Sequence, residues 1–148
     1  MSIQALENAA RAGDAQAQLQ LGIALMTGQG VPAPDVDRGR DWLARSADGG
    51  NAEAQRFLGM IYLRGMDVVP DYGKAVDCLQ SAASSGDAES AWWLACYLGG
   101  ARDEAFDASR ALKLLRQAAD AGHPRAMCHF AYALLTGCLG ETLSLIHI

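Results

Sequence analysis

The side chains most able to do chemistry in this sequence are two of the three histidines, His123 and His129, and four scattered cysteines. Cys128 and His129 are adjacent, but neighbouring residues of a helix point about 100° apart, so they form no preassembled nucleophile and base. His123 lies at a predicted helix start. We find no paired carboxylates and no other catalytic constellation, and we therefore predict no catalytic residues and no cofactor.

The cysteines also lack the spacing of a metal site. They include no Cys-x-x-Cys pair and no histidine at ligand spacing, so we predict no metal and interpret them as reduced, mostly buried thiols. Asp103 and Glu104 lack the spacing of a calcium loop. Since these residues form no catalytic or metal-binding pattern, we expect the chain to act by binding another molecule. The four cysteines are Cys78, Cys96, Cys128 and Cys138.

Composition and charge narrow the class of partner. The chain has 148 residues, of which 51% are hydrophobic and 20% charged, as in globular proteins. The net charge of -5, without a basic cluster, argues against nucleic acid or an anionic membrane as partner. The amino terminus has no signal-peptide pattern, which predicts a cytoplasmic location, and no apolar run reaches the roughly 20 residues of a membrane span.

A repeat sets the organisation of the chain. Four marker glycines, each following an Ala-rich or Ser-rich helix end, are 37, 36 and 36 residues apart. A fixed period of this size is typical of a helical solenoid. We expect each marker to close one helix in the left-handed conformation, and the next residue to cap the following helix. The markers are Gly13, Gly50, Gly86 and Gly122.

Each unit is predicted to contain two helices. The first, here called the A helix, has apolar or small residues four, eight and twelve positions after the marker, as an amphipathic helix does. The ninth position is always small, such as Gly22 and Gly59, which indicates the close approach of another helix. The second, or B, helix is predicted to begin at an aspartate cap, Asp35, Asp71 or Asp107.

The unit resembles the Sel-one-like repeat, a relative of the tetratricopeptide repeat. The hallmarks are clearest in the second unit, which runs through Leu58-Gly59, Tyr62, Gly65, Lys74-Ala75 and Gly86. The first unit departs from the pattern at Gly39, and the third lacks the glycine of the A helix. The resemblance covers residues 3–137: a half repeat at 3–12, repeats at 13–49, 50–85 and 86–121, and a half repeat at 122–137.

The resemblance implies an all-α fold, a right-handed solenoid of antiparallel helix pairs with about seven helices. It also implies a function: similar proteins are non-enzymatic adaptors, many of them bacterial, that hold other proteins together. Their A helices line a concave face that binds a protein or peptide.

The positions three, six, ten and thirteen after the marker are predicted to face this groove. Trp92 has two equally weighted interpretations, as an anchor for a partner or as packing between repeats. The groove positions include Gln16, Leu19, Ile23, Met26, Leu63, Cys96, Cys128 and Leu135. The residues that we predict to bind the partner are Glu53, Arg56, Met60, Glu89, Trp92, Arg125 and Tyr132.

An alternative function is self-association. A solenoid that ends within a repeat exposes the apolar side of its last helix, predicted at Pro124 to Thr136, and such a surface favours a homodimer. Residues 143–148 match the in-frame translation of a transposase adapter used in library preparation, and we interpret them as a non-biological tail.

Overall fold

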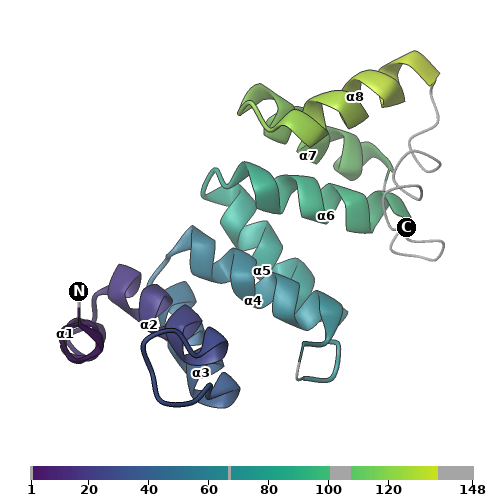
Figure 1. Ribbon diagram of the computed structural model, residues 1–148. Helices are drawn as coiled ribbons and strands as arrows, with labels where there is room; N and C mark the ends of the chain where they lie inside the picture. Colours follow the sequence, from purple (N-terminus) through teal and green to yellow (C-terminus); the bar gives the residue numbers. More distant parts are fainter. Residues whose placement is uncertain (1, 67, 101–107, 137–148) are drawn as a thin grey trace. The chain divides into compact units, whose positions relative to one another are not determined.

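A computed structural model describes residues 2–66, 68–100 and 108–136, and all regular secondary structure in these ranges is helical (Figure 1). The described residues form eight helices, one more than the predicted seven or so, because single helices flank three complete pairs. The fold is thus the predicted all-α repeat. The helices are α1 (Ile3–Arg11), α2 (Ala15–Thr27), α3 (Val36–Asp48), α4 (Ala52–Arg64), α5 (Tyr72–Ser84), α6 (Ala88–Gly100), α7 (Ala108–Asp120) and α8 (Pro124–Thr136).

The helix starts are set by the predicted caps. Asp14 accepts hydrogen bonds from the backbone N–H groups of Gln16 and Ala17 at 2.9 and 3.1 Å. Asn51 accepts from Ala54 at 3.0 Å. These side chains satisfy donors that a helix end leaves unpaired. Asp107 lies outside the described ranges. The remaining predicted caps act in the same way: they are Asp35, Asp71, Asp87 and His123.

The marker glycines take the left-handed conformation that was predicted for them. Gly13 has φ of 96° and Gly86 has φ of 94°, values that residues with a Cβ rarely adopt. Gly50 and Gly122 have similar positive values. Each marker therefore ends one helix and turns the chain into the next within a few residues.

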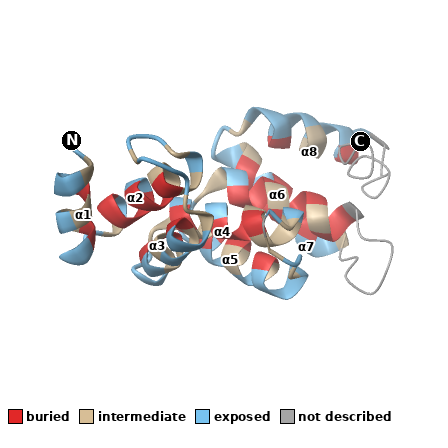
Figure 2. Ribbon diagram, turned by 60° about the horizontal axis from the view of Figure 1, so that its bottom comes forward, coloured by how far each residue is buried: buried red, intermediate tan, exposed pale blue. Residues whose placement is uncertain are grey.

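Contacts within the chain divide it into two compact units, residues 1–82 and 83–148. We call residues 1–82 unit 1 and residues 83–148 unit 2. In unit 1, one apolar cluster joins α1 to α2 through Leu6 and Leu21. A second joins α2, α3 and α4 through Leu19, Leu43 and Leu58. In unit 2, α7 packs against both α6 and α8. Figure 2 shows that exposed residues cover most of α8.

Two glycines bring α2 and α3 into close contact. A Cβ built on Gly22 would lie 2.9 Å from the carbonyl oxygen of Gly39, and α2 and α3 run antiparallel, with Met26 near Gly39 and Ala15 near Gly49. In the next repeat, a Cβ on Gly59 would lie 2.7 Å from Leu79 Cγ. The prediction that the ninth position marks a close helix crossing is confirmed, and Gly39 departs from the repeat pattern where it faces Gly22.

A glutamine of each repeat also donates to a backbone carbonyl near the end of the preceding B helix. Gln18 Nε2 donates to the Ala10 oxygen at 3.0 Å, and Gln55 Nε2 donates to the Ala47 oxygen at 3.1 Å. In the third repeat the donor is on α7 instead: Gln117 Nε2 donates to the Ala83 oxygen at 2.7 Å. These bonds pair carbonyls that a helix end leaves without an intrahelical partner.

Candidate protein-binding surfaces

The predicted binding residues of unit 1 lie along one side of α4. Arg56 Nη2 is 3.6 Å from Glu53 Oε1, an ion pair between residues one turn apart. The Arg56 guanidinium also lies 5.8 Å from the centre of the Phe57 ring. Met60, a further turn along, is half-buried. The structure therefore places a charge pair and an accessible apolar side chain on one surface of the helix.

The neighbouring A helix, α2, meets α4 at its amino end. Asn51 Nδ2 donates to Gln16 Oε1 at 3.1 Å, which ties the start of α4 to the start of α2. Leu19, at the sixth position after its marker, is buried in the cluster with Leu43 and Leu58. Leu19 consequently packs between helices instead of facing a partner.

Trp92 of unit 2, at the same position after its own marker as Leu19, is also buried. The indole is only 2% exposed, and its Nε1 donates to His129 Nδ1 at 2.9 Å. The Trp92 ring stacks on the rings of His123 and His129, with centroids 5.4 and 5.9 Å apart. The Arg125 guanidinium lies 5.4 Å from the Trp92 ring centre. The burial of Trp92 favours packing between α6 and α8 over direct contact with a partner.

The hydrogen bond from Trp92 requires a neutral imidazole. An indole N–H can only donate, so Nδ1 of His129 has to be unprotonated to accept it. Burial lowers the pKa of His129 from its ordinary value, and the positive charges of Arg125 and His123 lower it further. The fold thus favours the neutral form of His129, the form that accepts the Trp92 hydrogen bond.

The stability of unit 2 is expected to depend on this neutral state. Because the pKa of His129 is lower in the folded chain than the unfolded value of about 6.5, His129 stabilises the fold above that value. The stabilisation is lost as pH falls through the folded pKa. Urea unfolding at about pH 7.5 and about pH 5.5 will measure the loss. His129→Asn keeps an acceptor but cannot titrate, and an unchanged pH dependence in that variant would contradict the assignment.

The other predicted residues of unit 2 are accessible. Glu89 on α6 and Arg125 on α8 are exposed, and Tyr132 on α8 is 48% exposed. Sequence reasoning identified these residues by their spacing after the marker glycines. It could not identify the pairing of Trp92 with His129, because that contact depends on how successive A helices pack.

The described cysteines differ in exposure. Burial raises the pKa of the Cys96 thiol to about 12, so this thiol is protonated. Cys78 is half-buried, whereas Cys128 is exposed, so the interpretation of buried thiols is wrong for Cys128. Cys138 lies outside the described ranges, as does the 143–148 tail. Among the described residues, no group of three or more His, Cys, Asp or Glu side chains could hold a metal ion.

No helix in the described part of the chain is long and apolar enough to cross a membrane. The antiparallel pairing of α2 with α3, repeated caps and repeated glycine crossings define the class: a helical-repeat protein of the solenoid type. The sequence model of the Sel1 repeat family matches residues 15–51, 52–87 and 88–123, and these matches together cover most of the chain. The chain therefore belongs to the Sel1 repeat family, whose proteins generally act in protein–protein interaction.

Two solved structures show the same fold. The chain superimposes with a TM-score of 0.88 and 26% identity on c5321, a protective antigen of uropathogenic Escherichia coli strains with an SLR fold; the match covers 97% of this chain but only 31% of that protein. A Sel1 repeat protein from Oxalobacter formigenes gives a TM-score of 0.80 and 27% identity, covering 86% of this chain and 96% of that one. No curated protein matches the sequence.

Proposed function

We propose that this chain is a scaffold that binds a protein or peptide on the face that its A helices line, the face that the resemblance implies to be concave. The observation that carries the proposal is the exposure of Tyr132, at 48%, on the same helix as the exposed Arg125. Tyrosine and arginine are enriched among residues that dominate protein interfaces. The Sel1 repeat family, to which the chain belongs, supports this general role.

Each unit contributes its own candidate surface. In unit 1 it comprises the Glu53–Arg56 ion pair and Met60 on α4. In unit 2 it comprises Glu89, Arg125 and Tyr132, with Trp92 beneath Arg125 as support. Opposite charges beside an apolar side chain suit an extended or helical peptide with apolar anchors. Arg125 lies over the ring of the buried Trp92, and Trp92 itself does not contact the partner.

We further propose that the chain has no catalytic activity of its own. The family is typically a non-catalytic scaffold. His129 is engaged by Trp92 at 2.9 Å, and His123 accepts the backbone N–H of Ala126 as a helix cap at 3.2 Å. Both imidazoles therefore have structural partners that account for them.

Peptides selected from a random library on the immobilised chain will test the binding surfaces. Tyr132→Ala is expected to weaken peptides that bind unit 2 by about tenfold or more, as truncation of an interface anchor does. Met60→Ala is expected to weaken peptides that bind unit 1. Isothermal titration calorimetry on the purified variants, with circular dichroism to check helicity, will measure both effects.

The matched control is Lys113→Glu, a charge change at an exposed position of the B helix α7. It is expected to leave the affinity of the selected peptides unchanged. Peptides that bind Tyr132→Ala and Met60→Ala as well as the unaltered chain, but lose affinity for Lys113→Glu, would place the surface on the B helices and overturn the proposal.

A second candidate is self-association through α8. Leu135 is 86% exposed and Leu134 is also exposed on this helix, and adjacent exposed apolar side chains favour association. Light scattering across a concentration series would detect a homodimer, and Leu134→Glu with Leu135→Glu should return it to a monomer. A molar mass independent of concentration would exclude this candidate.

A further inference from the structure

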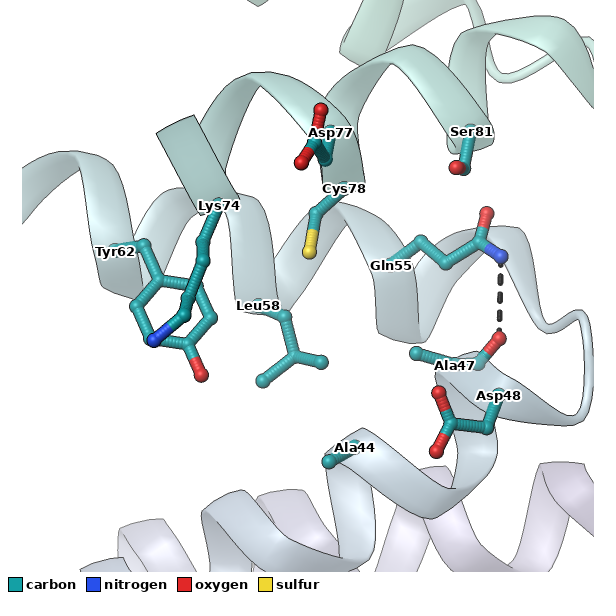
Figure 3. A pocket seen from close by; sticks show the side chains of 10 residues that line it. All are labelled: Ala44, Ala47, Asp48, Gln55, Leu58, Tyr62, Lys74, Asp77, Cys78 and Ser81. Carbon is teal, nitrogen blue, oxygen red and sulfur yellow. Dashed lines mark hydrogen bonds between the residues drawn. The ribbon is translucent and has the colours of Figure 1, made fainter. Parts of the chain in front are cut away.

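Unit 1 contains a pocket on the side of α4 that faces the B helices α3 and α5. Its volume is about 320 Å³, and all three helices line it. Figure 3 shows Leu58 and Cys78 near its middle, Tyr62 and Lys74 at one end, and Gln55 and Asp48 at the other. The lining residues are Ala44, Ala47, Asp48, Gln55, Leu58, Tyr62, Lys74, Asp77, Cys78 and Ser81. The pocket combines an apolar middle with charged ends.

Two carboxylates give the pocket an uncompensated negative charge. Asp48 on α3 and Asp77 on α5 lie on opposite walls, and neither has an ion-pair or hydrogen-bond partner among the described residues. Lys74, the cation of the lining, is paired elsewhere: its Nζ lies 3.2 Å from Asp71 Oδ2. The charge of Lys74 is therefore already matched by Asp71, which leaves Asp48 and Asp77 available.

The middle of the pocket responds to this negative charge. Burial raises the pKa of the Cys78 thiol, and the carboxylates of Asp77 and Asp48 raise it further. Both carboxylates thus act on the same atom from opposite sides. A positively charged group bound in the pocket would gain from both carboxylates.

An unpaired oxygen adds to the negative potential. Gln55 Nε2 is held by the Ala47 carbonyl at 3.1 Å, which fixes the side-chain amide. Gln55 Oε1 is buried, with no hydrogen-bond partner in the described chain. Buried polar atoms are nearly always paired in native proteins, so an unpaired acceptor beside a pocket points to a missing donor.

The position of Asp48 is itself unfavourable for the fold. It is the last residue of α3, where the negative end of the helix dipole repels a carboxylate. The described structure gives Asp48 no cation in return. A residue that breaks a local rule without a structural benefit is commonly a functional one.

We propose that this pocket binds an arginine side chain of a partner protein. The alkyl stem lies against Leu58 and Ala44, and the guanidinium lies beside the Asp48 carboxylate. Arginine fits better than lysine, because its planar, weakly hydrated guanidinium pairs with carboxylates in a fixed geometry and its long stem suits an apolar middle. The proposal goes beyond the A-helix surfaces, because α3 and α5 contribute to neither, and each proposal can fail without the other.

Titration of the 15N-labelled full chain with Nα-acetyl-arginine methylamide will test the pocket. We expect saturable NMR shifts, at millimolar concentration, of the Gln55 side-chain amide and the Leu58 and Cys78 backbone amides. The citrulline analogue has the same shape without the charge and should bind about tenfold more weakly, since hydrogen bonds between charged groups are the stronger ones.

Asp48→Asn should also weaken arginine binding about tenfold. Because the substitution removes a carboxylate from the negative end of the α3 dipole, the melting temperature should stay the same or rise. Weaker binding by this variant therefore cannot be explained by unfolding. Asp41→Asn, at an exposed position of α3 outside the pocket, should bind arginine unchanged. Equal binding of arginine and citrulline, shifts only elsewhere in the chain, or full affinity in Asp48→Asn would each overturn the proposal.

Discussion

Replacing Trp92 with alanine is expected to lower the free energy of unfolding of unit 2 by about 3–5 kcal/mol. The indole is almost completely buried, and it holds α6 against α8 through its hydrogen bond to His129 and its stacking on His123. The alanine variant loses the buried ring, leaves a cavity, and removes the donor from His129. Urea unfolding followed by circular dichroism will measure the change.

Trp42→Ala is the matched control for that substitution. Trp42 on α3 is only half-buried, with the Arg45 guanidinium 4.7 Å from its ring centre, so its truncation removes less buried surface. Hydrogen exchange should show lost protection in α6 to α8 for Trp92→Ala, with unit 1 less affected. If both variants lost the same free energy of unfolding, the hydrogen bond and the ring stacking of Trp92 would contribute little to stability, and the prediction would be wrong.

Gly39→Ala is the second substitution with a large expected effect. An added Cβ would collide with the Met26 side chain and would lie 2.7 Å from the Gly22 carbonyl oxygen and 3.1 Å from the Met26 nitrogen. Two of these three atoms belong to the backbone of α2, so the helices have to separate. The expected cost is about 1–3 kcal/mol, as for other overpacked cores, in spite of the better helix propensity of alanine.

Gly73→Ala separates helix propensity from packing. Gly73 lies in the first turn of α5, is exposed, and the nearest atom to an added Cβ is Asp71 Oδ1 at 3.5 Å. We expect this variant to gain up to about 1 kcal/mol. Thermal and urea unfolding of both alanine variants, measured side by side, should therefore shift in opposite directions. A stabilised Gly39→Ala would mean that α2 and α3 do not cross as closely as the structure indicates.

Much of the fold could be predicted because its determinants are local. The cap of Asp14 and the left-handed Gly13 depend on a few consecutive residues. The close crossing at Gly22 also followed from one small residue at a repeated position. Such signals recur in every repeat, so each repeat supports the interpretation of the others.

The binding surface was harder to predict because it depends on how neighbouring repeats pack against each other. A helical wheel places Leu19 and Trp92 beside the residues that face a groove, yet both are buried. The deciding fact is how far one A helix covers the next, which spacing along one helix does not contain. The pocket lined by Asp48, Leu58 and Asp77 was missed for the same reason, since three helices have to come together to form it.

The glutamine bonds between consecutive repeats have a consequence for how such a chain can evolve. Gln18, Gln55 and Gln117 each belong to the later repeat, and each pairs with a carbonyl of the earlier one. A duplicated repeat therefore brings its own donor to whichever repeat precedes it. A deleted repeat removes its donor, and the repeat that follows supplies another. Unequal recombination between copies of the coding unit can thus lengthen or shorten the array while a glutamine bond of this kind forms again at the new junction.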